Sequence, residues 1–187
     1  MLWWILGVGI FLLALIIGFS FYAFRVAFYS SPKRNENPHD LPSGESFKRA
    51  EGVMHTLIDE LSAHAYEEVC VTSFDGLKLY ARYYHVCDGA PLQIQVHGYR
   101  GVALRDFCGG AKLAREVGHN ILLIDHRAHG KSEGKVVTFG INESQDLLTW
   151  IDYAVRRFGS EEGPNKENLF PRVIYLKEYQ AQLLLVF

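Results

Sequence analysis

The chain opens with a long, uninterrupted run of apolar positions. Residues 2–24 contain no charged residue, no proline and no amide side chain. A helix of this length rises roughly 34 Å, enough to cross a hydrocarbon core of about 30 Å. Tryptophans at one end and Tyr22 and Tyr29 near the other suit the two membrane interfaces. We therefore predict a transmembrane anchor over residues 1–29, with residues 2–24 in the lipid bilayer.

A cleaved signal peptide is the competing interpretation of this segment. Such a peptide has basic residues ahead of a shorter apolar stretch of about 7–15 residues. Nothing basic precedes the apolar run here, whereas Arg25, Lys33 and Arg34 follow it. The distribution favours a single-pass membrane protein, and the positive-inside rule places the rest of the chain in the cytoplasm.

The apolar pattern after the anchor is that of an α/β domain. Residues 30–46 are rich in Pro, Asn, Ser and Gly and indicate a linker, so residues 47–187 form the expected domain. Helical spacing begins at Phe47. A period of two follows on both sides of Asp75-Gly76, which predicts a β-hairpin with a type I′ turn.

Two strand–helix units come next along the chain. Residues 92–96 and the nearly apolar residues 120–124 predict strands, and each is followed by an amphipathic helix. Asn142, with Gln145 three residues later, predicts the N-cap of the second helix. Strands that alternate with helices imply parallel strands with helices on both faces, in addition to the hairpin.

Charge and cysteine content narrow the classes of function. The formal net charge is −2, and the part that begins at Glu36 has 16 basic against 21 acidic residues. An acidic domain is a poor candidate for binding nucleic acid, which needs a basic surface. Three cysteines without C-x-x-C spacing argue against a disulfide scaffold. His126 and His129 form an H-x-x-H pair on a loop with no evident third ligand, so we expect no metal.

The loops that follow the two strands carry the informative motifs. The first strand ends in His97-Gly98-Tyr99, and the second in Asp125-x-Arg127-x-x-Gly130-x-Ser132. This arrangement, over residues 67–159, resembles the N-terminal half of the α/β-hydrolase fold. It is most similar to bacterial membrane-anchored hydrolases of the serine-aminopeptidase-like and esterase-like group.

The resemblance implies a function and roles for these loops. Intact relatives would hydrolyse ester or amide bonds of small molecules or peptides through a serine nucleophile, without a cofactor. The Tyr99 backbone N–H would donate to an oxyanion, with His97 and Gly98 shaping its turn. The loop of Asp125, Arg127 and the residues up to Ser132 would be structural. The family usually has glycine where Ala128 stands.

Gly130-Lys131-Ser132-Glu133-Gly134 fits the G-x-S-x-G pattern of a nucleophile elbow. A true elbow joins a strand directly to a helix. Residues 136–140 intervene here before any helix begins, so we predict that Ser132 is not a nucleophile.

The elbow belongs after a fifth strand, which we predict at residues 172–176. Residues 177–187 contain neither serine nor glycine, and the acid and histidine of a triad would lie still later. We therefore expect a truncated, inactive hydrolase domain without catalytic residues, whose last strand is an unpaired edge. A shifted reading frame that hides a Gly-Ile-Ser elbow after residue 176 is one explanation. The alternative is a non-catalytic, membrane-tethered binding module.

Overall fold

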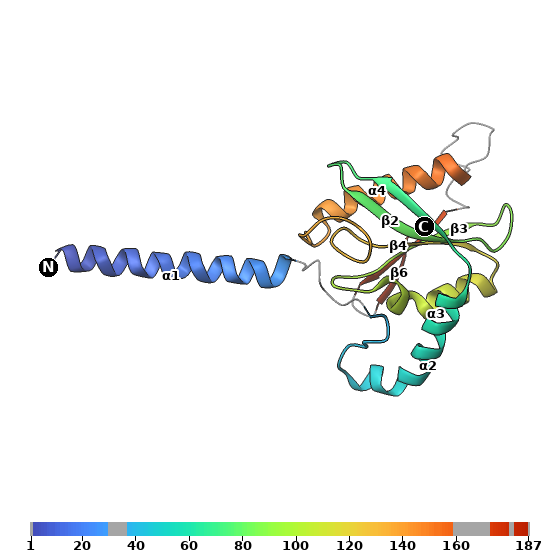
Figure 1. Cartoon of the computed structure of the whole chain (residues 1–187), viewed down its shortest axis with the longest axis horizontal. Helices are drawn as coiled ribbons and strands as arrows, with labels where there is room; N and C mark the ends of the chain where they lie inside the picture. The colour runs from blue at the N-terminus through green and yellow to red at the C-terminus, as the bar shows by residue number, and fades with distance from the viewer. Residues whose placement is uncertain (1, 30–36, 159–172, 180–181, 187) are drawn as a thin grey trace.

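The computed structural model describes residues 2–29, 37–158, 173–179 and 182–186. A twisted sheet forms the centre of the domain, and α1 projects away from it (Figure 1). The elements are α1 (Leu2–Phe28), α2 (Glu45–Ala63), β1 (Glu67–Thr72), β2 (Lys78–Tyr84), β3 (Leu92–Val96), α3 (Ala103–Glu116), β4 (Asn120–Ile124), α4 (Ile141–Phe158), β5 (Val173–Tyr179) and β6 (Gln182–Val186).

The sheet is mixed, with strand order β1-β2-β4-β3-β5-β6. β3 pairs in parallel with β4 on one side and with β5 on the other, whereas β1 and β2 form the expected antiparallel hairpin. The expectation that the fifth strand ends as an unpaired edge is wrong. β6 pairs antiparallel with β5 from Tyr175↔Val186 to Tyr179↔Gln182 and satisfies that edge.

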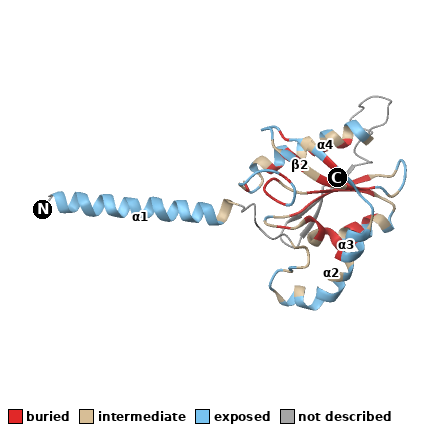
Figure 2. Cartoon of the chain, in the orientation of Figure 1, coloured by how far each residue is buried: buried red, intermediate tan, exposed pale blue. Residues whose placement is uncertain are grey.

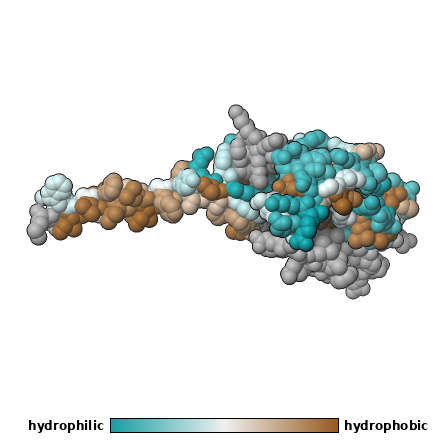
Figure 3. Space-filling view, turned by 90° about the horizontal axis from the view of Figure 1, so that it is seen from below, coloured by the Kyte–Doolittle hydropathy of each residue, from teal (hydrophilic) through white to brown (hydrophobic). Residues whose placement is uncertain are grey.

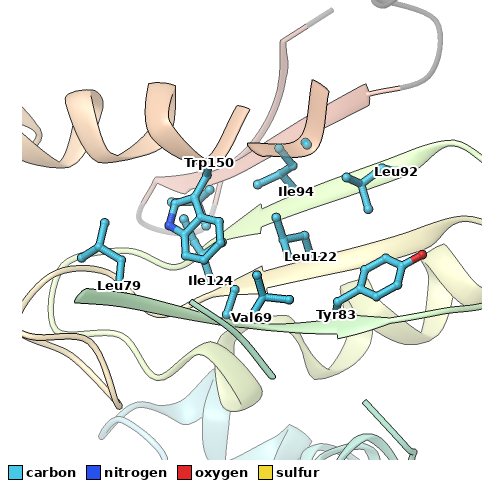
Figure 4. Close-up of a cluster of buried hydrophobic side chains, with 11 residues drawn as sticks. Val69, Leu79, Tyr83, Leu92, Ile94, Leu122, Ile124 and Trp150 are labelled. Carbon is cyan, nitrogen blue, oxygen red and sulfur yellow. The ribbon is translucent and has the colours of Figure 1, made fainter. Parts of the chain in front are cut away.

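Each face of the sheet buries its own apolar cluster, because side chains alternate along a strand. Leu122 and Ile124 of β4 face α4, where Trp150 packs over the sheet (Figure 4). Ile121 and Leu123 point the other way, toward the cluster beneath α2 and α3. All five residues of β4 are buried, as the apolar run predicts for a strand covered on both faces.

The turn between β1 and β2 differs from the predicted type I′ turn. Gly76 has a φ of 90°, but Asp75 keeps a negative φ, and five residues separate the strands. Ser73 explains the difference, because its hydroxyl donates to the Asp75 carboxylate at 2.6 Å and accepts the Leu77 N–H at 2.8 Å. These side-chain bonds close a wider loop than a two-residue turn.

The start of α4 also differs from the prediction, since Asn142 is not its N-cap. Thr138 Oγ1 accepts the Asn142 N–H at 2.9 Å. The Glu143 carboxylate accepts hydrogen bonds from the Thr138 N–H, the Thr138 hydroxyl and the Gly140 N–H, at 2.6–2.8 Å. Thr138 and Glu143 thus form a reciprocal capping arrangement that begins upstream of the predicted cap.

α1 lies outside the domain core and is exposed over residues 3–26, whereas its last two residues are half-buried (Figure 2). Its apolar surface contrasts with the mainly hydrophilic residues that are coloured on the face of the domain in Figure 3. Residues 3–28 are long and apolar enough to cross a membrane. The last turn contacts the domain, because the Val137 N–H donates to the Phe28 carbonyl at 2.8 Å. Tyr29, directly after the helix, forms a β-bridge with Val136.

Candidate active-site edge of the sheet

The loops singled out from the sequence lie together at one edge of the sheet. β3 and β4 are parallel neighbours with Val96 opposite Ile124, so the segments that follow them leave the sheet side by side. The carboxyl edge of parallel strands is where open α/β sheets place their ligand sites.

His97 ties these two loops together. Its side chain is buried, its Nδ1 lies 2.9 Å from the Gly98 carbonyl, and its Nε2 accepts the His126 N–H at 3.1 Å. Burial, with the neighbouring rings of His126 and His129, holds the pKa of His97 well below 6.5. A neutral ring is what these bonds require, with Nδ1 as donor and Nε2 as acceptor. The imidazole therefore positions the loops.

A tight turn follows His97 at this edge. The Gly101 N–H donates to the Gly98 carbonyl at 3.0 Å, with Tyr99 and Arg100 at the centre of the turn. Arg100 adopts a φ of 53°, which is uncommon for a residue with a side chain. Among the residues that the structure describes, no acceptor pairs with the Tyr99 N–H.

Arg127 anchors the loop after β4 to the rest of the domain. Its guanidinium makes paired hydrogen bonds to Asp146 of α4, at 2.6 and 2.7 Å, and to Asp75 of the β1–β2 loop, at 2.9 and 3.2 Å. Burial opposes the charge of Arg127, but the bonds to the two carboxylates outweigh it and raise its pKa. The Arg127 bond and the Ser73 hydroxyl lower the pKa of Asp75.

Ser132 is a structural residue of the same loop. Its hydroxyl donates to the Asp125 carbonyl at 2.7 Å and accepts the Tyr80 N–H at 2.9 Å, so it bridges the ends of β4 and β2. The side chain is buried. No helix begins within eight residues after it, whereas an elbow requires one at once. That Ser132 is not a nucleophile stays a prediction.

Asp125 and Gly130 close the loop. The Asp125 carboxylate accepts the Lys131 N–H at 3.1 Å, and burial raises the pKa of Asp125. A β-carbon on Gly130 would lie 2.2 Å from that carboxylate, and Gly130 has a φ of 51°. Glycine is therefore required by both contact and backbone. Ala128 also has a positive φ, 61°, which explains why glycine suits that position.

Three residues of this edge escaped the sequence analysis as site residues. The sequence pattern places Asp75 in a hairpin turn, and it gives Asp146 and Glu143 no role. Their carboxylates become informative once the fold brings Asp146 and Asp75 to Arg127, and Glu143 to the Thr138 backbone. At a polar position of a helix, a carboxylate that the fold buries against a partner looks the same in the sequence as one that stays in solvent.

The mixed sheet with helices on both faces, together with these loops, is a partial α/β-hydrolase fold. No protein-family model and no curated protein matches the sequence. Among solved structures, DcsB in complex with its substrate analogue is similar with a TM-score of 0.50 and 18% identity, over 60% of this chain and 36% of that chain.

Two further structures carry hydrolase descriptions. The Pyrococcus furiosus esterase Pf2001 is 29% identical with a TM-score of 0.48, over 54% of this chain and 38% of that chain. An α/β hydrolase from Vibrio vulnificus is 20% identical with a TM-score of 0.45, over 64% of this chain and 38% of that chain. The chain thus spans well under half the length of the structures that it matches, and the resemblance drawn from its loops is confirmed at the level of fold.

Proposed function

We propose that this chain is a membrane-anchored α/β-hydrolase homologue that supplies the oxyanion loop of such a site but no nucleophile. The observation that carries the proposal is the Tyr99 N–H, which is unpaired among the described residues and follows Gly98, whose carbonyl contacts His97 at the carboxyl edge of the sheet. A fixed N–H dipole at this place stabilises negative charge on a carbonyl oxygen without reorganising.

The segment after β5 supports the absence of turnover by residues 1–187. A nucleophile elbow is a sharp turn from a strand into a helix. Here β5 continues to Tyr179 and pairs with the antiparallel β6, and residues 177–187 include no serine. In an intact enzyme of this fold a serine would attack the ester or amide of a small molecule or peptide. We propose that this chain alone does not perform that step.

A fluorophosphonate probe tests the proposal directly. Full-length chain in detergent micelles should remain unlabelled under conditions that label an active serine hydrolase added as a positive control. Labelling that persists in the wild type and vanishes in Ser132→Ala would refute the proposal, because it would identify Ser132 as a nucleophile.

We further propose that α1 anchors the chain as a single transmembrane pass with the domain in the cytoplasm. The length and apolarity of α1 and the basic residues after it support this arrangement. The protein should stay with membranes through alkaline carbonate extraction. A reporter fused to the C-terminus should be inaccessible from outside the cell, and release by carbonate would contradict the anchor.

A non-catalytic, membrane-tethered binding module is the second candidate. The pairing of β5 with β6 favours it, because it leaves neither edge of a central strand open. The test is whether residues 36–187 are soluble and unfold cooperatively while remaining inert to the fluorophosphonate. Aggregation of this fragment would count against an independent module.

A further inference from the structure

The domain caps the carboxyl end of α1. The last carbonyls of a helix have no partner within the helix. Here the Tyr99 hydroxyl donates to the Ala27 carbonyl at 2.5 Å, the Arg100 guanidinium donates to the Val26 carbonyl, and the Val137 N–H donates to the Phe28 carbonyl. The oxyanion loop and the segment before α4 therefore lie directly against the end of the membrane helix.

The position of these contacts along α1 determines how far they lie from the hydrocarbon core of the bilayer. About 20 helical residues span a hydrocarbon core, and the headgroup layer adds roughly 5–8 Å on each side. If the core ends near Phe24, the carbonyls of residues 26–28 lie about 3–6 Å beyond it at 1.5 Å per residue. Side chains bonded to those carbonyls lie in the headgroup layer.

Exposed apolar side chains gather at this same place. The rings of Tyr99 and Phe139 stack with centroids 4.5 Å apart, and Phe28 packs edge-on against Phe139 at 5.1 Å. Phe139 is 52% exposed, and Ile141, two residues later, is 76% exposed. Figure 1 shows the segment before α4 beside the end of α1. We call Tyr99, Phe139 and Ile141 the interfacial patch.

The backbone holds Phe139 in this place at a cost. Its φ is 52°, a left-handed conformation that is a true outlier for a bulky residue. Glu143 fixes the residues on either side, because its carboxylate binds the N–H groups of Thr138 and Gly140. Burial alone would raise the pKa of Glu143, but these bonds and that of the Thr138 hydroxyl lower it below 4.5.

Basic residues border the patch. Arg25 lies in the last turn of α1, Arg100 follows Tyr99, and Lys135 precedes the residue that bridges to Tyr29. Cations around exposed aromatic and aliphatic side chains are the composition that binds the interface of an anionic bilayer.

We propose that the interfacial patch inserts into the headgroup layer of the membrane that α1 crosses, so that the oxyanion loop meets membrane lipids. This inference rests on the proposed membrane anchoring of α1. The carboxyl edge of the sheet would then bind ligands that come from the bilayer, namely amphiphilic esters and amides.

Photochemical labelling by lipids tests this placement. The full chain is reconstituted in vesicles of phosphatidylcholine and phosphatidylglycerol that contain a phospholipid with a diazirine near its ester groups. Adducts are mapped by tandem mass spectrometry after illumination. We expect adducts on α1, at residues 99–100 and at residues 136–141. Leu113 and Val117 are the internal control, because both are exposed apolar residues near the opposite, amino edge of the sheet.

Two outcomes overturn the inference and are distinguishable. Adducts on α1 with the patch labelled no more than Leu113 would refute the insertion of the patch but leave the anchor intact. Absence of adducts on α1 would refute the anchor as well, and the inference would fall with it.

A substitution that preserves folding gives the second measurement. Phe139→Gly removes the ring and suits a φ of 52°, so the variant should fold. Adducts at residues 136–141 should fall about tenfold, since a phenyl ring is withdrawn from the interface, while those on α1 stay unchanged. Leu148→Ala, at an exposed position of α4, is the matched control and should leave the pattern unaltered. Equal labelling in wild type and Phe139→Gly would contradict the role of the ring.

Discussion

Arg127 and Asp146 form a buried, bidentate ion pair, with Nε–Oδ2 at 2.6 Å and Nη2–Oδ1 at 2.7 Å. The pair joins the loop after β4 to α4, and its two residues are 19 positions apart in the sequence. Asp75 adds a second, more exposed carboxylate from the β1–β2 loop. One guanidinium thereby fixes three segments around the carboxyl edge of the sheet.

Removal of this guanidinium should destabilise the domain strongly. Arg127→Leu leaves Asp146 buried without its partner, and such a loss lowers the free energy of unfolding by about 3–5 kcal/mol. Arg127→Leu combined with Asp146→Leu removes both charges and should recover much of that loss. Urea unfolding of the full chain in detergent micelles, followed by near-ultraviolet circular dichroism, measures both. If the double variant is no more stable than Arg127→Leu, the unpaired charge of Asp146 is not the cause of the lost stability.

Ala128→Gly should stabilise the protein. The left-handed backbone at Ala128 costs a residue with a β-carbon about 1–2 kcal/mol. Glycine removes this strain, but it loses more conformational entropy on folding, which offsets part of the gain. We expect the free energy of unfolding to rise by about 0.5–1 kcal/mol in the same urea experiment. Ala50→Gly, the same change within α2, should lower it by about 1 kcal/mol. A decrease in both variants would show that the backbone at residue 128 is not strained.

Ser132→Ala should lower stability through lost hydrogen bonds. The Tyr80 N–H loses its acceptor and the Asp125 carbonyl loses a donor, which costs about 1–3 kcal/mol. Ser144→Ala is the matched control, since that hydroxyl is exposed on α4 and its loss should change stability by less than about 0.5 kcal/mol. Thermal unfolding of the two variants side by side gives the comparison, and equal shifts would contradict a bridging role for Ser132.

His97 should make stability depend on pH on the acid side of neutrality. Because burial lowers its pKa in the folded state, the unfolded chain binds a proton below pH 6.5 that the folded chain excludes. The free energy of unfolding should therefore fall by up to about 1.4 kcal/mol per pH unit below 6.5. Urea unfolding between pH 7 and 5.5 measures this slope. His97→Gln should flatten it, whereas the exposed His85→Gln should not, and a slope retained in His97→Gln would identify another group.

The sequence predicted the sheet because its signals are local. Strands β3 and β4 coincide with the predicted residues 92–96 and 120–124, since continuous apolar runs between turn signals are typical of buried strands. The spacing of residues 136–140 between Ser132 and the next helix predicts that Ser132 is not part of a nucleophile elbow. Local rules failed where a side chain takes the place of a backbone hydrogen-bond partner. The Ser73 hydroxyl changes the predicted hairpin turn, and the Thr138 hydroxyl changes the predicted start of α4.

The sequence by itself determined the apolar N-terminal helix, the hydrolase-like half-sheet and the identity of its two motif loops, because periodicity and turn residues act within a few positions of the chain. Only the tertiary structure decided that Asp146 and Asp75 share Arg127, and that β6 pairs with β5. Only it placed Tyr99 against the Ala27 carbonyl of α1. The contacts of Arg127 with Asp75 and of Tyr99 with Ala27 join residues distant in sequence. A pattern along the chain does not encode which polar group folding will place against which partner.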